Sequence, residues 1–386
     1  MAEPFKNLFN EKIIEGMAEH FKKQWSIFDT KGFKTAASNN LESLELKQRS
    51  DQIMDAMVQY LPTDFKKASK IMLGSLGTPL ADDVSAGTVD ANGIAGWAVM
   101  PMAHYVGVHG HDHFDLSMTL LREMTICSSS EFGIRFFLIK SPKETLAILK
   151  RWSKDDNQHV RRLVSEGSRP RLPWAMRLPL FITDPIPVID LLERLKDDKK
   201  EYVRRSVANN LNDIAKDHPD LVADIAAQWM QGASDERKKM IRHACRTLIK
   251  NGHKKTLKVL GYGKAKIHKA ELELLTPKVK FGKELQFTLS VRSKSTKEQA
   301  LMIDYVIHHQ KANGSTTPKV FKLRATTLAA KGSLIIQKKH AIKKITTRVY
   351  YPGTHKIEVI VNGDCVAETE FQLLMQSPRT QKKQRA

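Results

Sequence analysis

The sequence of 386 residues predicts a mostly α-helical N-terminal part followed by an all-β C-terminal part. In roughly the first 260 residues, apolar residues recur at three- and four-residue steps, for example in 46–61 and 221–230. After Gly261-Tyr-Gly-Lys264 the period changes to two residues, because polar residues separate Leu285, Phe287, Leu289 and Val291. Since these two periods distinguish helices from strands, the chain changes structural class near residue 264.

A short pattern recurs within the helical part. His159-Val-Arg-Arg162, Tyr202-Val-Arg-Arg205 and Met240-Ile-Arg-His243 each begin a helix-like stretch after acidic or turn residues. The intervals between their aliphatic residues are 43 and 38 residues, close to the ~40–47 of HEAT-type helix pairs. We therefore expect a HEAT-like helical solenoid with a concave surface, interrupted by the prolines of 169–174.

The C-terminal pattern predicts an immunoglobulin-like sandwich. Alternating residues up to Val361 are followed by Asn362-Gly363, and Asn-Gly between two such runs is the strongest short hairpin signal. Roughly seven short strands in about 100 residues are typical of such sandwiches, although the Cys-Trp-Cys hallmark of antibody domains is missing. We expect a helical domain over 1–264, an Ig-like domain over 265–375 and a basic disordered tail over 376–386.

The charge is strongly basic and unevenly distributed. The chain has 63 Lys and Arg against 42 Asp and Glu, a net charge of +21, and residues 265–386 carry +14 of it. A field of this sign attracts polyanions such as nucleic acid, an acidic membrane surface or an acidic protein. The ordinary alternative is that the charge serves only solubility.

Other function classes are disfavoured. No apolar run approaches the roughly 20 residues of a membrane span, and charges interrupt the N-terminal stretch where a signal peptide would be apolar. Cys127, Cys245 and Cys365 lie far apart, so we expect neither a disulfide scaffold nor a zinc knuckle. These features predict a cytoplasmic protein without a membrane partner.

One cluster resembles a metal site. His109, His111 and His113 alternate with other residues beside Asp112 and Asp115, but no fourth-ligand motif accompanies them. We expect a polar loop here, and no metal or cofactor. Phosphate-binding GxxxxGK[ST] loops, GxSxG elbows and HExxH helices are also missing from the sequence.

Three carboxylates and a tryptophan among basic residues are the remaining candidates: Glu131, Glu166, Asp213 and Trp174. Each has a structural alternative. Glu131 would complete a capping box with Ser128, Glu166 would form helix-end salt bridges, and Asp213 would pair with Lys216. Trp174 would be a packing anchor. The residues alone leave these alternatives open.

Two long segments, however, resemble a known family. Val160-Arg-Arg-Leu-Val-Ser-Glu-Gly-Ser-Arg-Pro-Arg-Leu-Pro-Trp174 and Tyr202-Val-Arg-Arg-Ser-Val-Ala-Asn-Asn-Leu-Asn-Asp-Ile-Ala-Lys216 are similar to the AlkC branch of bacterial DNA alkylation repair glycosylases. The resemblance covers nearly the whole chain, from the opening Phe5-Lys-Asn-Leu-Phe-Asn10 to the Ig-like domain.

The resemblance implies a monofunctional glycosylase that removes cationic N-methylated bases, 3-methyladenine and 3-methylcytosine, without rotating them out of the duplex. It places the active site at Glu131, Glu166, Trp174 and Asp213. We expect Glu166 and Asp213 to stabilise the sugar cation or to activate water, Glu131 to act near the cationic base, and Trp174 to pack against either.

The expected partner is double-stranded DNA with alkylated bases, bound by a monomer that joins the bacterial nucleoid when bound. The expected DNA contacts are basic residues of both parts: Arg161, Arg162, Arg169, Arg171, Arg204, Arg205, Lys338, Lys339, Lys343 and Lys344. We expect the four lysines to lie between strand-like segments. A non-catalytic HEAT scaffold that binds DNA or an acidic protein is the rival hypothesis.

Overall fold

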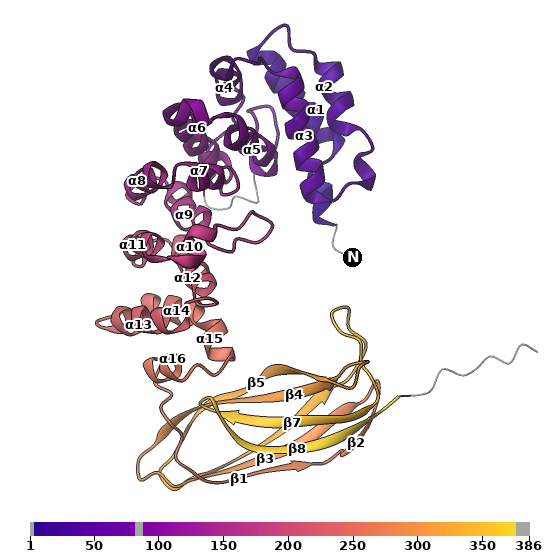
Figure 1. Ribbon diagram of the computed structural model, residues 1–386, viewed down its shortest axis with the longest axis vertical. Coiled ribbons are helices and arrows are strands. Elements are labelled where there is room, and N and C mark those ends of the chain that lie inside the picture. Colours follow the sequence, from indigo (N-terminus) through magenta and orange to yellow (C-terminus); the bar gives the residue numbers. More distant parts are fainter. Residues whose placement is uncertain (1–3, 82–87, 376–386) are drawn as a thin grey trace, which may run out of the picture. The chain divides into compact units, whose positions relative to one another are not determined.

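The computed structural model describes residues 4–81 and 88–375. In these residues helices precede strands, and the predicted fold class is confirmed (Figure 1). The predicted basic tail, 376–386, lies outside the described residues.

The helical elements lie between Phe5 and Val259. Their bounds are η1 (Phe5–Leu8), α1 (Glu11–Gln24), α2 (Thr30–Ser38), η2 (Leu41–Ser43), α3 (Leu46–Tyr60), α4 (Phe65–Gly74), η4 (Gly96–Ala98), α5 (Val99–His109), η5 (His111–His113), α6 (Phe114–Cys127), α7 (Ile134–Lys140), α8 (Pro142–Trp152), α9 (Gln158–Gly167), α10 (Pro179–Thr183), α11 (Ile186–Leu195), α12 (Glu201–Ile214), α13 (Pro219–Met230), α14 (Asp235–Ala244), α15 (Arg246–Lys250) and α16 (Lys254–Val259). The strands are β1 (Ile267–Leu274), β2 (Lys278–Lys280), β3 (Glu284–Ser293), β4 (Gln299–Gln310), β5 (Thr316–Leu328), β6 (Ser333–Ala341), β7 (Gly353–Val361) and β8 (Asp364–Leu374).

Helix starts and buried faces follow local chemistry. The Asn157 side chain accepts a hydrogen bond from the His159 backbone N–H and so caps α9, because the first N–H groups of a helix have no intrahelical partner. The predicted helix at 46–61 is α3, which buries Ile53, Met54 and Met57 on one face.

The chain forms two compact units. One comprises Met1–His218 with Gly232–Ala244, and the other comprises Pro219–Gln231 with Cys245–Ala386. Helices α13, α15 and α16 therefore group with the strands. The expected domain boundary at 264/265 stays a prediction.

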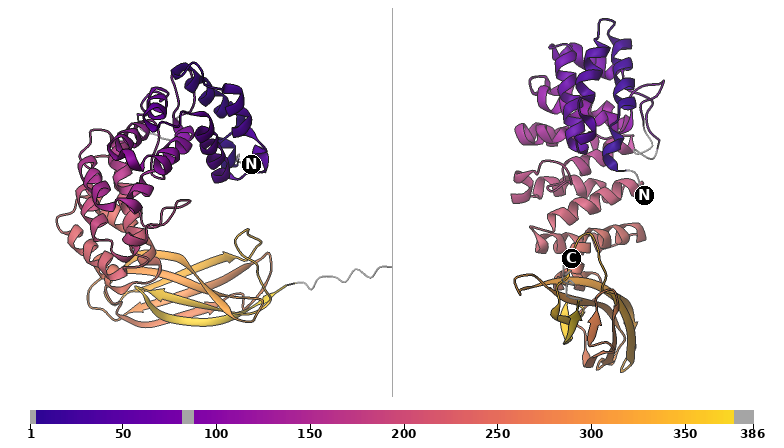
Figure 2. Two further views of the ribbon diagram at one scale, coloured as in Figure 1. Left: turned by 45° about the horizontal axis from the view of Figure 1, so that its top comes forward. Right: turned by 90° about the vertical axis from the view of Figure 1, so that its right-hand side faces the viewer.

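Successive helices of the first unit pack on one another. Helix α3 contacts α2 and α5, α9 contacts α8, α11 and α12, and α12 also contacts α14 (Figure 2). The three recurring sequence patterns lie in α9, α12 and α14, where Val160, Val203 and Ile241 are buried. Because α9 and α12 pack side by side, polar residues on their facing surfaces meet.

The strands form an Ig-like sandwich of two sheets, with orders β1-β3-β6 and β2-β8-β7-β4-β5. The predicted alternation in β3 is confirmed, since Leu285, Phe287, Leu289 and Val291 all lie in the core. Asn362 and Gly363 join β7 to β8 with φ of 50° and 86°, the left-handed backbone that such a hairpin turn needs.

The structure corrects one expectation for this unit. Lys338 and Lys339 were expected to lie between strands, but they lie within β6, where they pair with Phe287 and Gln286 of β3. A polar strand at a sheet edge has no continuous apolar alternation and therefore resembles a loop in sequence. Lys343 and Lys344 do lie in the connection between β6 and β7.

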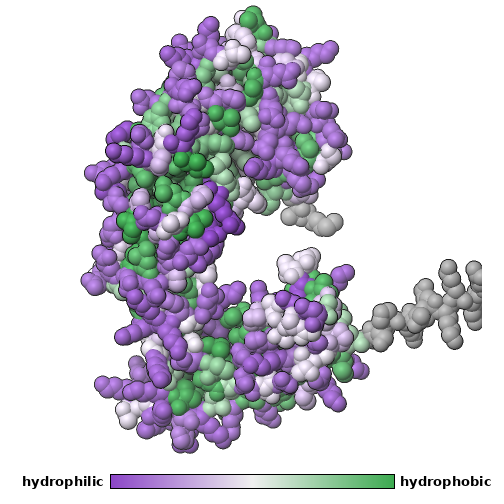
Figure 3. Space-filling model, in the orientation of Figure 1, coloured by the Kyte–Doolittle hydropathy of each residue, from purple (hydrophilic) through white to green (hydrophobic). Residues whose placement is uncertain are grey.

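The surface is mainly hydrophilic on the face drawn in Figure 3, with apolar areas between the polar side chains. Within 4–81 and 88–375, no helix combines the length and the apolar character that a membrane span requires.

Candidate active site

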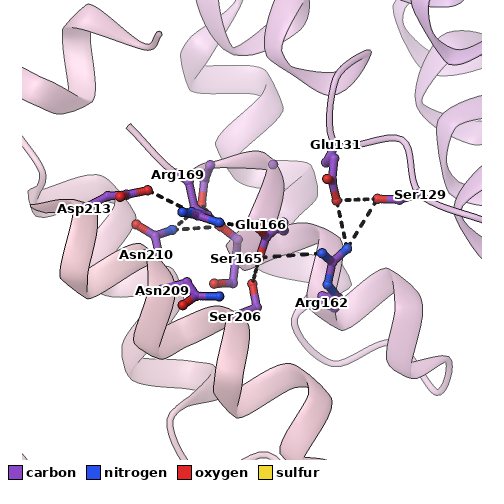
Figure 4. Close-up of polar contacts among 12 residues, drawn as sticks. Ser129, Glu131, Arg162, Ser165, Glu166, Arg169, Ser206, Asn209, Asn210 and Asp213 are labelled. Carbon is purple, nitrogen blue, oxygen red and sulfur yellow. Dashed lines mark hydrogen bonds and ion pairs between the residues drawn. The ribbon is translucent and has the colours of Figure 1, made fainter. Parts of the chain in front are cut away.

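The three candidate carboxylates come from three elements of the helical unit. Glu166 lies in the last turn of α9, Asp213 lies near the end of α12, and Glu131 lies in the turn between α6 and α7. The structure brings all three into one array of alternating charges: Glu131, Arg162, Glu166, Arg169 and Asp213 (Figure 4). We call these five residues the charge array.

Glu166 lies at the centre of the charge array and is 5% exposed. Its Oε1 accepts a hydrogen bond from Arg169 Nη1 at 2.5 Å, and its Oε2 accepts one from Ser206 Oγ at 2.6 Å. Burial alone would raise the pKa of this carboxyl, but the charges of Arg162 and Arg169 and these hydrogen bonds lower the pKa below its usual value. Glu166 is therefore ionised at neutral pH.

Asp213 occupies one end of the charge array. Its Oδ2 accepts from Arg169 Nε at 2.8 Å, and its Oδ1 accepts from Lys216 Nζ at 2.9 Å. The predicted pairing with Lys216 is thus present, but the sequence did not indicate that Arg169 joins Asp213 to Glu166. One guanidinium fixes two buried carboxylates from different helices, as the planar donor geometry of arginine allows.

Glu131 occupies the other end. Its Oε2 accepts from Arg162 Nη1 at 2.8 Å and from Ser129 Oγ at 2.7 Å. The alternative capping box with Ser128 is wrong, because α7 begins only at Ile134 and has no side-chain cap. With a side chain 15% exposed, Glu131 is the most accessible carboxylate of the charge array.

A pocket of about 180 Å³ opens beside Glu131. Trp97, Met100 and Phe132 form its apolar walls, and Ser128, Ser129, Glu131 and Arg162 are its polar lining. Gly167 permits α9 to approach the turn that carries Glu131, since a Cβ at Gly167 would lie 2.6 Å from Ile134 Cγ2. The pocket therefore places the ion pair of Glu131 and Arg162 beside an apolar surface.

Trp174 lies in the connection between α9 and α10, which contains no helix, as its prolines predicted. It is 61% exposed, so it is not the packing anchor that was its structural alternative. Its φ of 64° is unusual for a bulky residue and costs energy that surrounding contacts must supply. Strained backbone that presents an aromatic ring to solvent is a feature of functional sites.

Sequence reasoning missed the residue that shapes this connection. Arg135 is fully buried, and its guanidinium donates to the carbonyls of Gly167 (2.9 Å), Arg169 (2.8 Å) and Met176 (2.8 and 2.5 Å). Burial, with repulsion from Arg169, lowers the pKa of Arg135 to about 10. No local sequence signal identifies it, because all its acceptors are backbone atoms far along the chain.

Two further polar residues of α12 complete the site. Asn210 Nδ2 donates to the Ser165 carbonyl at 2.8 Å, which ties α12 to the end of α9. The Arg162 guanidinium lies over the ring of Tyr202, with its central carbon 5.1 Å from the ring centroid. Burial raises the pKa of Tyr202 to about 12. The aromatic ring and the two glutamates together fix Arg162.

The basic residues expected to contact DNA have different surroundings. Arg161 is buried, and it donates to Asp198 and to the carbonyls of Asp155 and Asp156, so its donors are committed within the protein. Arg162 and Arg169 belong to the charge array. Arg171 forms a bidentate pair with Asp217 at 2.8 and 2.7 Å.

Arg204 and Arg205 lie on α12 and line a surface pocket of about 310 Å³ with Lys239 and His243 of α14. Two glutamates, Glu201 and Glu236, also line it. Three basic side chains and one histidine thus converge on this pocket. Of the two pockets described so far, this one offers a phosphate more hydrogen-bond donors.

The histidine cluster does not gather into one site. His109 packs on Tyr105, His111 on Phe137 and His113 on Phe65, with ring centroids 4.8–5.3 Å apart. Across the described ranges, no three His, Cys, Asp or Glu side chains are grouped as metal ligands would be.

The charge array can stabilise positive charge without a metal. Its three carboxylates alternate with two guanidiniums, Lys216 also binds Asp213, and these contacts hold the carboxylates in place before any substrate arrives. Preorganised charge in a site that excludes water is the largest single contribution in many enzymes.

Comparisons with known proteins show the family of the chain. Residues 123–248 match the family described as DNA alkylation repair enzyme, and residues 268–375 match the C-terminal Ig-like domain of the uncharacterised protein YhaZ. YhaZ of Bacillus subtilis (strain 168) is 34% identical over 370 residues, which are 95% of this chain and 99% of that protein.

A solved structure extends the likeness. The alkylpurine DNA glycosylase AlkC of Pseudomonas fluorescens, bound to DNA containing an abasic site analog, is 35% identical, with a TM-score of 0.85. The match covers 96% of this chain and all of that one. The chain therefore belongs to the AlkC-type DNA alkylation repair enzymes with a C-terminal Ig-like domain.

Proposed function

We propose that this protein is a monofunctional DNA glycosylase that hydrolyses the N-glycosidic bond of cationic N-alkylated bases, 3-methyladenine and 3-methylcytosine, in double-stranded DNA. The observation that carries the proposal is the charge array, in which ionised carboxylates converge in a chain that resembles AlkC over almost its whole length.

The chemistry of these lesions fits carboxylates rather than a general acid. N3-methylation gives the base a positive charge, so the base leaves as a neutral molecule when the bond from C1′ to nitrogen breaks. The electron pair of that bond goes to the base, and positive charge develops on the deoxyribose. Nearby carboxylates stabilise this oxocarbenium-like state, and one of them accepts a proton from the water that attacks C1′.

Glu166 and Asp213 are the proposed residues for the sugar, and Glu131 is the proposed residue for the cationic base. The accessible position of Glu131 at an apolar pocket supports a role next to the base, because an aromatic cation is favoured there over a neutral base. Trp174, exposed and 6.2 Å from Phe5 between ring centroids, offers an aromatic face in a hollow that shares Met100 with the pocket of Glu131.

Arg169 donates to both Glu166 and Asp213 and is buried, so it positions these carboxylates and is not proposed to bind a phosphate. Arg162, with a side chain 18% exposed, is the arginine of the charge array that is proposed to reach the DNA backbone. The enzyme would need no deep pocket for a rotated base. Selectivity would come from the intrinsic lability of cationic lesions, so neutral adducts would be poor substrates.

The other proposed backbone contacts are Arg171, Arg204 and Arg205 of the helical unit and Lys338, Lys339, Lys343 and Lys344 of the Ig-like sandwich. The hollow on α12 and α14 supports Arg204 and Arg205, and the excess positive charge of the C-terminal third supports the four lysines. Arg171 is included because its pair with Asp217 lies at the surface. Arg161 is left out because its donors are committed to Asp198 and to backbone carbonyls.

The test is base release. Duplex DNA treated with a methylating agent is incubated with the protein, and released bases are separated by chromatography. We expect 3-methyladenine and 3-methylcytosine in the soluble fraction and abasic sites in the DNA. If no methylated base appears while the protein still binds this DNA, the proposal is wrong and the chain is a non-catalytic DNA-binding scaffold.

A further inference from the structure

The N-terminal segment 4–10 is firmly anchored but presents an aromatic ring to solvent. The buried guanidinium of Arg49 donates to the carbonyls of Lys6 (3.1 Å) and Phe9 (2.8 Å), and Phe9 itself is fully buried. Phe5 is nevertheless 64% exposed. Because its neighbours fix the segment, the exposed ring of Phe5 contributes little to the core and is available to a partner.

A second exposed ring meets Phe5 from a distant part of the chain. Trp174 lies 6.2 Å from Phe5 between ring centroids, with the two planes at 62°. Arg135 fixes the connection that carries Trp174 by hydrogen bonds to the carbonyls of Arg169 and Met176 within it and of Gly167 just before it. Two buried arginines, Arg49 and Arg135, thus position two solvent-exposed aromatic rings against each other.

The rings border a hollow of about 440 Å³. Leu46 and Met100 extend its apolar surface, and Lys6, Glu45 and Lys47 are its charged lining. Lys6 pairs with Glu45 at 3.1 Å, whereas Lys47 takes part in no ion pair within 4–81 and 88–375. Met100 also lines the pocket of Glu131, so the hollow adjoins the charge array.

We propose that Phe5 and Trp174 form a stacking platform for an unstacked base of duplex DNA at the lesion. Aromatic side chains stack on any base, because every base has a π-face, and a basic residue beside them binds the phosphate. The apolar hollow and the uncompensated charge of Lys47 match these two parts of a nucleotide. This inference rests on the proposed function, because that function supplies DNA as the partner.

The probe is a duplex that contains an abasic-site analogue beside 2-aminopurine, whose fluorescence falls when it stacks on an aromatic ring. We expect the full-length protein to quench this fluorescence on binding. Phe5→Ala should bind about 10-fold more weakly, which corresponds to about 1.4 kcal/mol, and should lose most of the quenching. Phe5→Tyr should restore both properties, whereas Phe5→Leu, which keeps an apolar side chain without the ring, should not.

Ile27→Ala is the matched control. Ile27 is 74% exposed on the same helical unit and lines none of the three pockets described above, so its loss should change neither the dissociation constant nor the quenching. Thermal unfolding midpoints should agree among all these variants. A lower midpoint for Phe5→Ala, together with failure of Phe5→Tyr to restore quenching, would identify a merely structural residue and overturn the platform.

The result of the quenching experiment can be distinguished from the result of the base-release test. If Phe5→Ala matches the wild type in affinity and quenching while the wild type still releases 3-methyladenine, the platform is wrong and the glycosylase proposal stands. If the wild type releases no base but quenching depends on Phe5, the platform stands and the glycosylase proposal is wrong. Equal behaviour of Phe5→Leu and Phe5→Tyr would show that an apolar surface suffices, which overturns stacking.

Discussion

Replacement of Arg135 by Met should both destabilise the helical unit and reduce excision. The change leaves the buried carbonyls of Gly167 and Arg169 and the half-buried carbonyl of Met176 without their donor. A buried group that loses its partner costs about 1–3 kcal/mol, and removal of a buried charge returns part of this cost. We expect a net loss of about 3 kcal/mol, or a fall of roughly 6–12 °C in Tm for a unit of this size.

The effect on excision should exceed the effect on folding. Arg169 joins Glu166 to Asp213, and Trp174 lies in the same connection, so displacement of this backbone by about 1 Å should lower the single-turnover rate roughly 10²-fold. The rate is measured well below the unfolding midpoint, where the variant is folded. Arg135→Lys should also fail, because one ammonium group lacks the fork that reaches three carbonyls. Wild-type Tm and rate in Arg135→Met would refute this reasoning.

Two other predictions concern the Ig-like unit. Replacement of Lys338, Lys339, Lys343 and Lys344 together by Gln should weaken DNA binding and reduce the slope of log affinity against log salt by up to about 3.6. An unchanged slope would show that these lysines do not contact phosphate. Burial lowers the pKa of His309 to about 3 and of His340 to about 4, so the unfolded chain binds more protons below pH 6.5. The stability of this unit should therefore be complete above pH 6.5 and fall by roughly 3 kcal/mol for each pH unit as the pH falls toward 4, as urea unfolding would measure. A flat profile would contradict the lowered pKa values of these two histidines.

Local pattern predicted much of the architecture. Alternation in β3 identified its buried residues, Asn362-Gly363 identified the turn between β7 and β8, and the prolines after α9 identified the break in the helices. The spacing of Glu166 to Arg162 and Arg169, and of Asp213 to Lys216, indicated the ion pairs that the structure contains. These features depend on neighbours within a few residues, which is why the sequence reveals them.

Contacts between distant segments were not predictable in the same way. Arg135 bonds only to backbone carbonyls, and any residue can supply those, so no pattern pairs it with 167–176. The exposure of Trp174 depends on its positive φ, which Pro-Trp does not encode. The union of Glu131, Glu166 and Asp213 depends on the packing of α9 against α12 and on the close approach at Gly167.

The measurement that tests the central claim most directly is the single-turnover rate of 3-methyladenine release by Glu166→Gln and Asp213→Asn. Each change keeps the shape of the side chain and its capacity to accept from Arg169 but removes the negative charge, so each rate should fall about 10²- to 10³-fold while DNA affinity stays within a few-fold. Asp197→Asn is the matched control, since Asp197 is also bound by an arginine, Arg237, but lies outside the charge array. Wild-type rates in both variants would contradict the assignment of these carboxylates to the reaction.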